Sequence, residues 1–320
     1  MTSSDANIPG NWKDSAIQAA TTTLREMQIA GVNDECCRVV ERHVAGFVAE
    51  RYGPCLWVAW HRSSAPTPGD VAAVESLARA VGCNHWLIDE MLNRGDTPNA
   101  TRRLASSAFP QRWTAKEADA RYILRSDRGQ APGLFLDQRT NRREVAASSE
   151  DARVLNLFAY TCSFSVVAAL GRASQTVNVD ASGPFLDWGR DNFQLNALER
   201  PQDLFWKGDV RDFLKLARKR AERFDLIVLD PPTFSRSRKR PFNVRNELVP
   251  LAGQCLELLS PGGKMLVATN LSSWSRDDLA KMVAPMARGA SIRSQPLPIG
   301  IAESEHTAKS CWVSKTGNAR

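Results

Sequence analysis

From Arg153 onward, the chain alternates short apolar runs with longer stretches in which apolar residues recur at helical spacing. The short runs are VLNLF, TVNVD, DLFW, FDLIVLD and KMLVATN, and the longer stretches are SFSVVAALGRA, LDWGRDNFQLNAL, DVRDFLKLARKR and NELVPLAGQCLELL. Strands that alternate with helices in this way are typical of a parallel sheet covered by helices on both faces. The pattern therefore predicts an α/β fold for this part of the chain.

The residues before this region have a smaller and less regular pattern. Apolar spacing predicts helices over residues 14–30 and 34–52, a strand over 55–61, a helix over 69–81 and a further apolar segment over 85–92. This succession is typical of a small α/β module. We assign Trp57 and Trp60 to one face of the predicted strand, where they are more typical of a core than of a platform for stacking bases.

A polar stretch over residues 93–110, rich in turn-forming residues, predicts a linker after this module. The runs QRWTA and ARYILRS then predict a β-hairpin, which is followed by the segment FLDQR, Phe135–Arg139. The expected parts are a disordered tail over 1–12, an N-terminal α/β module over 13–108, the hairpin with the FLDQR segment over 109–145, and the main domain over 146–320.

Composition and charge narrow the class of protein. Hydrophobic residues make up 43% of the 320 positions, which suits a packed globular protein. No window approaches about 18 uninterrupted apolar residues, and the first twelve residues lack a basic region and a hydrophobic stretch, so we expect a cytoplasmic protein without a membrane partner. The seven cysteines include no CxxC pair and the four histidines lie far apart, so neither a metal site nor a disulfide framework is expected. The net charge of +7 favours polyanionic partners.

The residues that follow the predicted strands are the candidates for ligand binding, because open α/β sheets bind ligands beyond the carboxyl ends of their strands. They are FAYTCS, Asp180, Asp209, Asp230-Pro231-Pro232 and Asn270. The first turn contains no glycine, whereas a dinucleotide-binding turn has G-x-G-x-x-G and a P-loop is glycine-rich. A ligand without phosphate, such as S-adenosylmethionine, fits this turn better.

Two of these carboxylates suit a nucleoside. Asp180 is placed to accept hydrogen bonds from both ribose hydroxyls, and Asp209 could accept from the adenine amino group. The alternative is that both residues are helix N-caps, where Asp is favoured over Ala by about 1 kcal/mol.

An ordered set of segments now supports a resemblance to a known family. The set GLFLDQR, VLNLFAYTCSFS, VNVD, NFQLNAL, FDLIVLDPPTFSRS and LLSPGGKMLVATN resembles the class I S-adenosylmethionine-dependent methyltransferases that modify bacterial 23S ribosomal RNA. Within them it is most similar to the guanine-N7 methyltransferase half of the bifunctional large-subunit enzyme. The resemblance covers about residues 110 to 315, and DPPTFS with FLDQR is its most discriminating part. It implies a Rossmann-like, seven-stranded sheet for the main domain, with the smaller N-terminal α/β module ahead of it.

The resemblance also implies roles for individual residues. The residues implied to bind S-adenosyl-L-methionine are Gln138, Arg139, Phe158, Ala159, Tyr160, Thr161, Cys162, Asp180, Asp209 and Asp230. Asp230 would lie near the methionine and the target base, and the FLDQR segment would fold over the cofactor from outside the sheet. Relatives usually carry glycine where this chain has Cys162, which bears on how closely the backbone can approach the cofactor.

The choice of target atom depends on the turn DPPTF, whose candidate catalytic residues are Asp230, Pro231, Pro232 and Phe234. A 5-methylcytosine enzyme needs a cysteine nucleophile after the fourth or fifth strand, and this chain has none there. Guanine N7 has a lone pair and no proton to lose, so transfer to it needs mainly proximity and orientation. An exocyclic amine would instead need the acceptors that the aspartate and a proline carbonyl supply. The turn itself fits either guanine atom, and the resemblance favours N7.

Two features beyond the turn suit RNA. Phe234 could stack on the target base, or it could pack in the core. The basic run Arg236, Arg238, Lys239 and Arg240 could contact phosphates, or it could be a solvated loop.

The sequence predicts an S-adenosylmethionine-dependent methyltransferase that acts on a guanine of 23S ribosomal RNA, or of a large-subunit precursor, by direct transfer. The alternatives are an enzyme of the same fold that acts on a small molecule or a protein, a 5-methylcytosine methyltransferase, and a non-catalytic RNA-binding protein with a vestigial cofactor pocket.

Overall fold

The computed structural model describes residues 12–91, 103–128, 131–235, 240–287, 289–305 and 307–316. Internal contacts divide the chain into two units. The first runs to Leu136 and includes Ile299–Ala302, and the second comprises Asp137–Pro298 and the chain from Glu303 onward. The predicted segment over 109–145 is thus divided, since its hairpin belongs to the first unit and the residues from Asp137 belong to the second.

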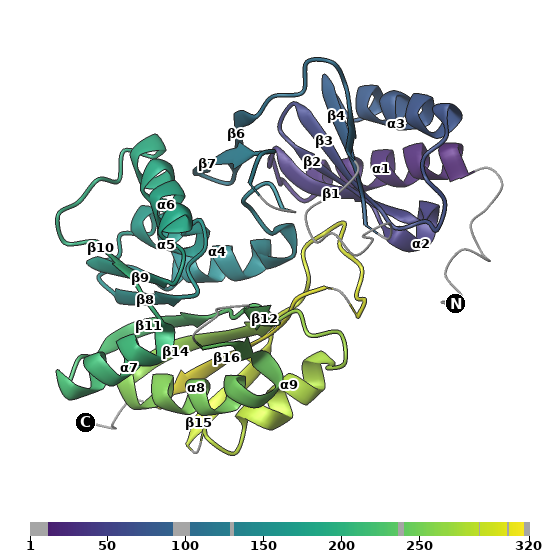
Figure 1. Cartoon of the computed structure of the whole chain (residues 1–320). Coiled ribbons are helices and arrows are strands. Elements are labelled where there is room, and N and C mark those ends of the chain that lie inside the picture. The colour runs from purple at the N-terminus through teal and green to yellow at the C-terminus, as the bar shows by residue number, and fades with distance from the viewer. Residues whose placement is uncertain are drawn as a thin grey trace. The chain divides into compact units, whose positions relative to one another are not determined.

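The alternating pattern of the second unit forms one seven-stranded sheet (Figure 1). In sheet order its strands are β10 (Leu204–Lys207), β9 (Gln175–Asp180), β8 (Arg153–Leu157), β11 (Phe224–Leu229), β14 (Leu259–Thr269), β16 (Lys309–Lys315) and β15 (Ala290–Ser294). The first five are parallel, and β16 is antiparallel to both of its neighbours. The predicted α/β fold with a seven-stranded sheet is confirmed.

Helices cover both faces of this sheet (Figure 1). One layer contains α4 (Arg139–Ala147), α5 (Ser163–Leu170) and α6 (Gly183–Leu195), and the other contains α7 (Val210–Lys219), α8 (Val244–Leu258) and α9 (Arg276–Val283). Side chains cap several of these helices at the first turn: Ser182 accepts from Phe185 N, and Asn243 accepts from Arg245 N. Such caps satisfy backbone N–H groups that the helix itself leaves without partners.

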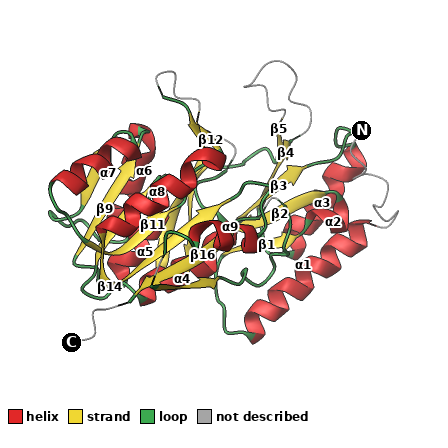
Figure 2. Cartoon of the chain, turned by 90° about the horizontal axis from the view of Figure 1, so that it is seen from below, coloured by secondary structure: helices red, strands yellow, loops and turns green. Residues whose placement is uncertain are grey.

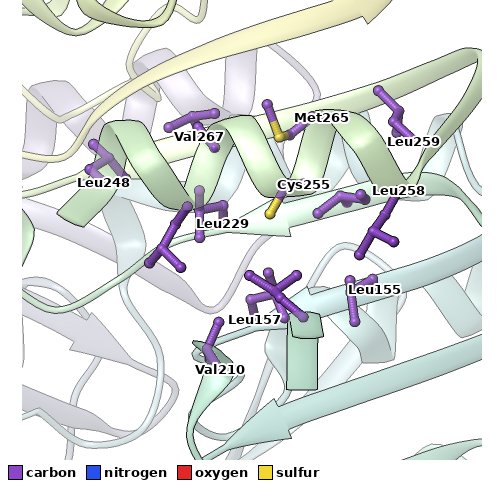
Figure 3. Close-up of a cluster of buried hydrophobic side chains, with 14 of the residues drawn as sticks. Leu155, Leu157, Val210, Leu229, Leu248, Cys255, Leu258, Leu259, Met265 and Val267 are labelled. Carbon is purple, nitrogen blue, oxygen red and sulfur yellow. The ribbon is translucent and has the colours of Figure 1, made fainter. Parts of the chain in front are cut away.

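The core of the second unit is built around β11. Its residues Leu226, Ile227, Val228 and Leu229 are all fully buried, because β8 and β14 flank the strand and helices cover both of its faces. Figure 3 shows part of this core, where α8 packs its apolar side chains onto the sheet. Burial of each such side chain stabilises the fold by about 1.5–3 kcal/mol, so this strand is held firmly in place.

The register brings the carboxyl ends of the parallel strands to one edge. Leu157 at the end of β8 is level with Val179 on β9 and with Leu229 on β11, and Leu229 is level with Val267 on β14. The turns that follow these strands therefore start side by side.

The first unit contains a five-stranded sheet with helices packed against it (Figures 1 and 2). Its strands are β1 (Cys36–Val40), β2 (Phe47–Tyr52), β3 (Cys55–Trp60), β4 (His85–Glu90) and β5 (Arg103–Ala105), and its helices are α1 (Trp12–Ile29), α2 (Arg42–Ala45) and α3 (Pro68–Ala80). A separate hairpin pairs β6 (Arg112–Glu117) with β7 (Ala120–Arg125), as predicted.

The helix predicted over residues 34–52 is wrong. That stretch forms β1, the short helix α2 and β2, with β1 and β2 antiparallel. The segment CCRVV is rich in residues that favour strands, and Gly46 adopts a left-handed conformation that ends α2 after one turn. Pairing of β2 with β3 across the short turn at residues 53 and 54 then outweighs the local helical spacing.

Trp57 and Trp60 are both buried, as predicted, but they lie on opposite faces of β3 because they are three residues apart. Trp60 stacks on Phe47, and Trp57 contacts Phe109. Both therefore belong to the packing of the first unit. No helix among the described residues is long and apolar enough to cross a membrane.

Candidate active site

The turn after β8 is held in an unusual backbone conformation. Phe158, Tyr160 and Cys162 have φ values of 58°, 49° and 60°, in the left-handed region that residues with a Cβ occupy at a cost of roughly 1 kcal/mol or more each. Asn192 on α6 donates to Thr161 O at 3.0 Å and holds the turn from outside. Strain of this kind persists where the surrounding structure imposes it, and it often marks a functional site.

Cys162 occupies a place that the resemblance assigns to glycine, and its side chain fits because of a second residue. The thiol is fully buried against Gly189 of α6. A Cβ on Gly189 would overlap Cys162 Sγ and lie 3.0 Å from Cys162 Cβ. The side chain is therefore turned away from the open edge of the sheet into space that Gly189 leaves, and the backbone at Cys162 still has the left-handed conformation that glycine adopts readily.

Asp180 lies at the end of β9, beside this turn. Its Oδ2 accepts from Tyr160 N at 2.9 Å and its Oδ1 accepts from Ser182 N at 2.8 Å. The cap of α6 is Ser182, so the N-cap alternative for Asp180 is wrong. Burial raises the pKa of this carboxyl, and the two backbone hydrogen bonds oppose the rise. Each oxygen still has a lone pair with which it can accept a ligand hydroxyl.

Asp209 has a structural role in this conformation. It caps α7, and Arg211 binds both of its oxygens, from Nε at 2.8 Å and from Nη2 at 2.6 Å. The Arg211 guanidinium lowers the pKa of the carboxyl. These contacts bear out the N-cap alternative for this residue, while the predicted contact with adenine stays a prediction.

Asp230 follows β11 at the centre of the same edge. It is half-buried, and burial raises its pKa from 3.8 to about 7, with a further rise from the charge of Asp137 and an opposing effect of Arg142. Gln138 Nε2 donates to Asp230 Oδ2 at 3.3 Å. Gln138 therefore reaches the DPP turn, and a carboxyl that changes its charge near neutral pH lies where the strands end.

The residues that follow Asp230 in the DPPTF turn become exposed toward its end. Pro231 is buried and Pro232 is exposed, and Thr233 Oγ1 donates to Asn270 Oδ1 at 2.6 Å, which links this turn to the one after β14. Phe234 begins the short strand β12 (Phe234–Ser235), which pairs with β13 (Phe242–Asn243). Its side chain is 64% exposed, so the alternative that it packs in the core is wrong.

The predicted basic run is described only in part. Arg236, Arg238 and Lys239 lie outside the described residues. Arg240 pairs with Asp212 at 2.8 Å, and its carbonyl accepts from Arg211 Nη2. Since both side chains of this ion pair are about half exposed, the pair is weak and a phosphate can compete for Arg240.

The other residues predicted to bind the cofactor are Phe158, Ala159 and Arg139. Phe158 packs against Phe242 with ring centroids 5.2 Å apart, Ala159 is buried and donates its N–H to Val179 O, and Arg139 is buried at the start of α4. Sequence reasoning missed three residues that join this region through side-chain hydrogen bonds, namely Asn141, Ser310 and Trp312. The polar Asn141 on the buried face of α4 was the available signal.

The cysteines do not suit nucleophilic catalysis. All seven are buried. Burial raises the pKa of the Cys311 thiol to about 12, and it also raises the pKa values of the Cys162 and Cys255 thiols. A thiolate is the form that attacks a base. Among the described residues, no cluster of three or more His, Cys, Asp or Glu side chains could hold a metal ion.

A family model described as S-adenosylmethionine-dependent methyltransferase matches residues 74–292. The chain belongs to this methyltransferase family. Ribosomal RNA large subunit methyltransferase K of Neisseria meningitidis is 40% identical over 149 residues, which is 46% of this chain and 42% of that protein. Methyltransferase K/L of Shewanella pealeana is 34% identical over 249 residues, 76% of this chain and 34% of that protein. The chain thus spans less than half the length of these curated relatives.

Solved structures of methyltransferases share the fold. SMU.776, crystallised with S-adenosylhomocysteine, is 24% identical with a TM-score of 0.79 over 94% of this chain and 81% of that chain. The S-adenosylmethionine-dependent methyltransferase from Agrobacterium tumefaciens is 21% identical with a TM-score of 0.69 over 89% of this chain and 90% of that chain. These similarities support the Rossmann-like architecture of the methyltransferase.

The residues at the edge where the parallel strands end fit the cofactor of the methyltransferase family. Asp180 offers acceptors for the ribose hydroxyls, and the left-handed turn over 158–162 carries no phosphate-binding glycine motif. When bound, the cofactor would supply an electrophilic methyl group on a sulfonium. Asp180 would orient its nucleoside, and the carboxylate form of Asp230 would complement the positive charge.

The fit between Cys162 and Gly189 predicts that the effect of Gly189→Ala on stability depends on the residue at position 162. Gly189→Ala should destabilise the protein by about 1–3 kcal/mol, because the new methyl group overlaps the thiol. In a Cys162→Gly background the same change should cost nothing or stabilise by up to about 1 kcal/mol, since alanine favours the helix. Urea unfolding of the four proteins tests this, and equal costs in both backgrounds would contradict it.

Asp180→Ala should weaken S-adenosylhomocysteine binding about tenfold to a hundredfold, because two hydrogen bonds to a carboxylate are lost. Isothermal titration measures the Kd, with Asp230→Ala as the matched variant, which should keep much of the affinity. Thermal unfolding checks that the turn around Tyr160 survives. An unchanged Kd in Asp180→Ala would show that the carboxylate does not hold the ligand.

The raised pKa of Asp230 predicts a pH-dependent effect on stability. The folded state holds a proton on this carboxyl between about pH 4 and 7 while the unfolded state has released it, so the stabilisation is present below pH 4 and is lost as the pH rises through 7. Asp230→Asn should therefore raise the Tm at pH 8 more than at pH 5. A Tm difference that is equal at both pH values would mean that the carboxyl titrates normally.

Proposed function

We propose that this methyltransferase acts on RNA and transfers its methyl group directly to a guanine of large-subunit ribosomal RNA. The observation that carries the proposal is the DPPTF turn at the end of β11, which combines a half-buried carboxyl with an aromatic ring 64% exposed two residues beyond the second proline. An exposed aromatic beside a site for methyl transfer suits a flipped-out base, which gains about 1–3 kcal/mol by stacking. The names of the relatives, which are large-subunit ribosomal RNA methyltransferases, support the same substrate.

The chain's charge suits this substrate. Its net charge of +7 favours a polyanion, and Arg240 at the edge of the turn is held only by an exposed ion pair. No proton has to be removed from the base, since guanine N7 carries a lone pair and is nucleophilic at neutral pH. The proposal includes 23S ribosomal RNA, free or in a large-subunit precursor, and the cytoplasm as the place of action.

Direct transfer is favoured over a covalent route. The buried cysteines with raised pKa values oppose the thiolate attack that 5-methylcytosine formation requires. In direct transfer Phe234 would hold the base by stacking and Asp180 would orient the cofactor. Asp230 and the Pro231 carbonyl would define the position of the guanine edge. The resemblance favours N7, and an exocyclic amine is the alternative that the acceptor at Asp230 would serve.

Incubation of the purified protein with tritium-labelled cofactor tests the substrate class. RNA from a strain that lacks the gene, a protein fraction and a small-molecule fraction are offered separately. Label should enter the RNA, and Asp230→Ala should reduce the rate by at least about a hundredfold while it keeps much of the affinity for S-adenosylhomocysteine. Label only in the protein or small-molecule fraction would refute the proposal.

Phe234→Leu provides a more specific variant in the same assay. The change removes the aromatic face and keeps an apolar side chain, so the KM for RNA should rise several-fold or more. The Kd for S-adenosylhomocysteine should stay the same. Phe205→Leu on the edge strand β10 is the matched control, because it removes a ring that packs against Phe193 away from the DPPTF turn.

A further inference from the structure

A chain of side-chain hydrogen bonds leads from β16 to Asp230. Trp312 Nε1 donates to Asn141 Oδ1 at 3.1 Å. Asn141 Nδ2 donates to Gln138 Oε1 at 2.6 Å and to Ser310 Oγ at 3.0 Å. Gln138 Nε2 then donates to Asp230 Oδ2 at 3.3 Å. Trp312, Asn141, Gln138 and Ser310 are all buried, so this relay is shielded from water.

The indole sets the direction of the whole relay. An indole N–H can only donate, so Asn141 must present its oxygen to Trp312 and its NH₂ group to Gln138. Gln138 must then accept through its oxygen, which leaves its NH₂ group toward Asp230. The oxygen and the NH₂ group of an amide are alike in shape, so without the donor at Trp312 the amide groups of Asn141 and Gln138 could rotate and exchange these two ends. Buried amides that lack partners are costly, so rotation of one amide would bring rotation of the other.

We propose that Trp312 and Asn141 are positioning residues that hold the Gln138 amide with its N–H toward Asp230 and thereby favour the carboxylate form of Asp230. The inference rests on the role proposed above for Asp230 in methyl transfer. Neither residue lies in the DPPTF turn or the FLDQR segment, and Trp312 is 82 positions beyond Asp230 in the sequence. Through the relay, Trp312 on the antiparallel strand β16 would influence the charge of Asp230 at the end of the central strand β11.

The relay acts against burial and the charge of Asp137, and in the same direction as Arg142. Burial and the charge of Asp137 raise the pKa of Asp230, while Arg142 on α4 lowers it. Asp137 is itself near Lys309 of β16 and accepts from Ala308 N at 2.9 Å. A carboxyl with a pKa of about 7 is close to half ionised at neutral pH. The N–H that Gln138 donates to Oδ2 favours the ionised form, and a reversed Gln138 would favour the protonated form.

Trp312→Phe tests the relay, because it removes the N–H and keeps an aromatic ring. The pKa of Asp230 in the free protein is measured by ¹³C NMR of carboxyl-labelled aspartate, with Asp230→Asn to assign the resonance. Trp312→Phe should raise this pKa by roughly one unit, a tenfold increase in proton affinity. Trp206→Phe, which removes an indole from the edge strand β10, should leave it unchanged.

A second variant separates the relay from a general loss of packing. Gln138→Met should also raise the pKa of Asp230, and adding Trp312→Phe to it should cause no further rise, because the last link is already gone. If Trp312→Phe does not fold, Asn141→Leu is tested in the same two backgrounds. An unchanged pKa in Trp312→Phe, or an equal rise in the Gln138→Met background, would overturn the proposal. These measurements need no RNA, so failure to methylate RNA would leave the inference about the relay standing and would refute only the proposed substrate.

Discussion

The position of β11 is the constraint on which the candidate site depends. Its apolar side chains are removed from water on both faces, and β8 and β14 pair with it along its length. A strand fixed in this way delivers Asp230 to one place at the edge of the sheet. Because the neighbouring parallel strands end level with it, Asp180 and the left-handed turn after β8 reach the same edge. The chemistry of the site is thus positioned by burial of residues that take no part in it.

The edge also concentrates features that are costly for the fold. Three residues with a Cβ adopt left-handed conformations between Phe158 and Cys162, and burial opposes the ionised forms of Asp180 and Asp230. Compensation comes from nearby groups. Gly189 makes room for the thiol of Cys162, backbone N–H groups bind Asp180, and Gln138 donates to Asp230. A stable scaffold that supports a strained edge is typical of an enzyme site.

Local sequence signals were sufficient for the five parallel strands and for the residues that follow them, whereas the count of seven strands came from the family resemblance. The run FDLIVLD predicts a buried strand followed by a turn, and the alternation of strands and helices around it predicts parallel strands. Other parts of the chain had ambiguous local signals. Residues 34–52 have helical spacing but form β1 and β2, because β2 pairs with each of its two neighbours in sequence. The role of Asp209 was ambiguous because the same residue type caps helices and binds nucleosides, and the contact with Arg211 decides its present role. Asn141 and Trp312 are 171 positions apart, so no local pattern could join them.

We propose that the edge that carries Asp180, Asp230 and Phe234 directs methyl transfer to a guanine of large-subunit ribosomal RNA. The most direct measurement is nucleotide-resolution mass spectrometry of 23S ribosomal RNA from cells that carry the gene, lack it, or carry only the Asp230→Ala form. The account predicts one methylguanine that is present with the intact gene and absent in both other strains, and fragmentation of the nucleoside identifies N7 or the exocyclic amine as the modified atom. Identical methylation maps in all three strains would contradict the account.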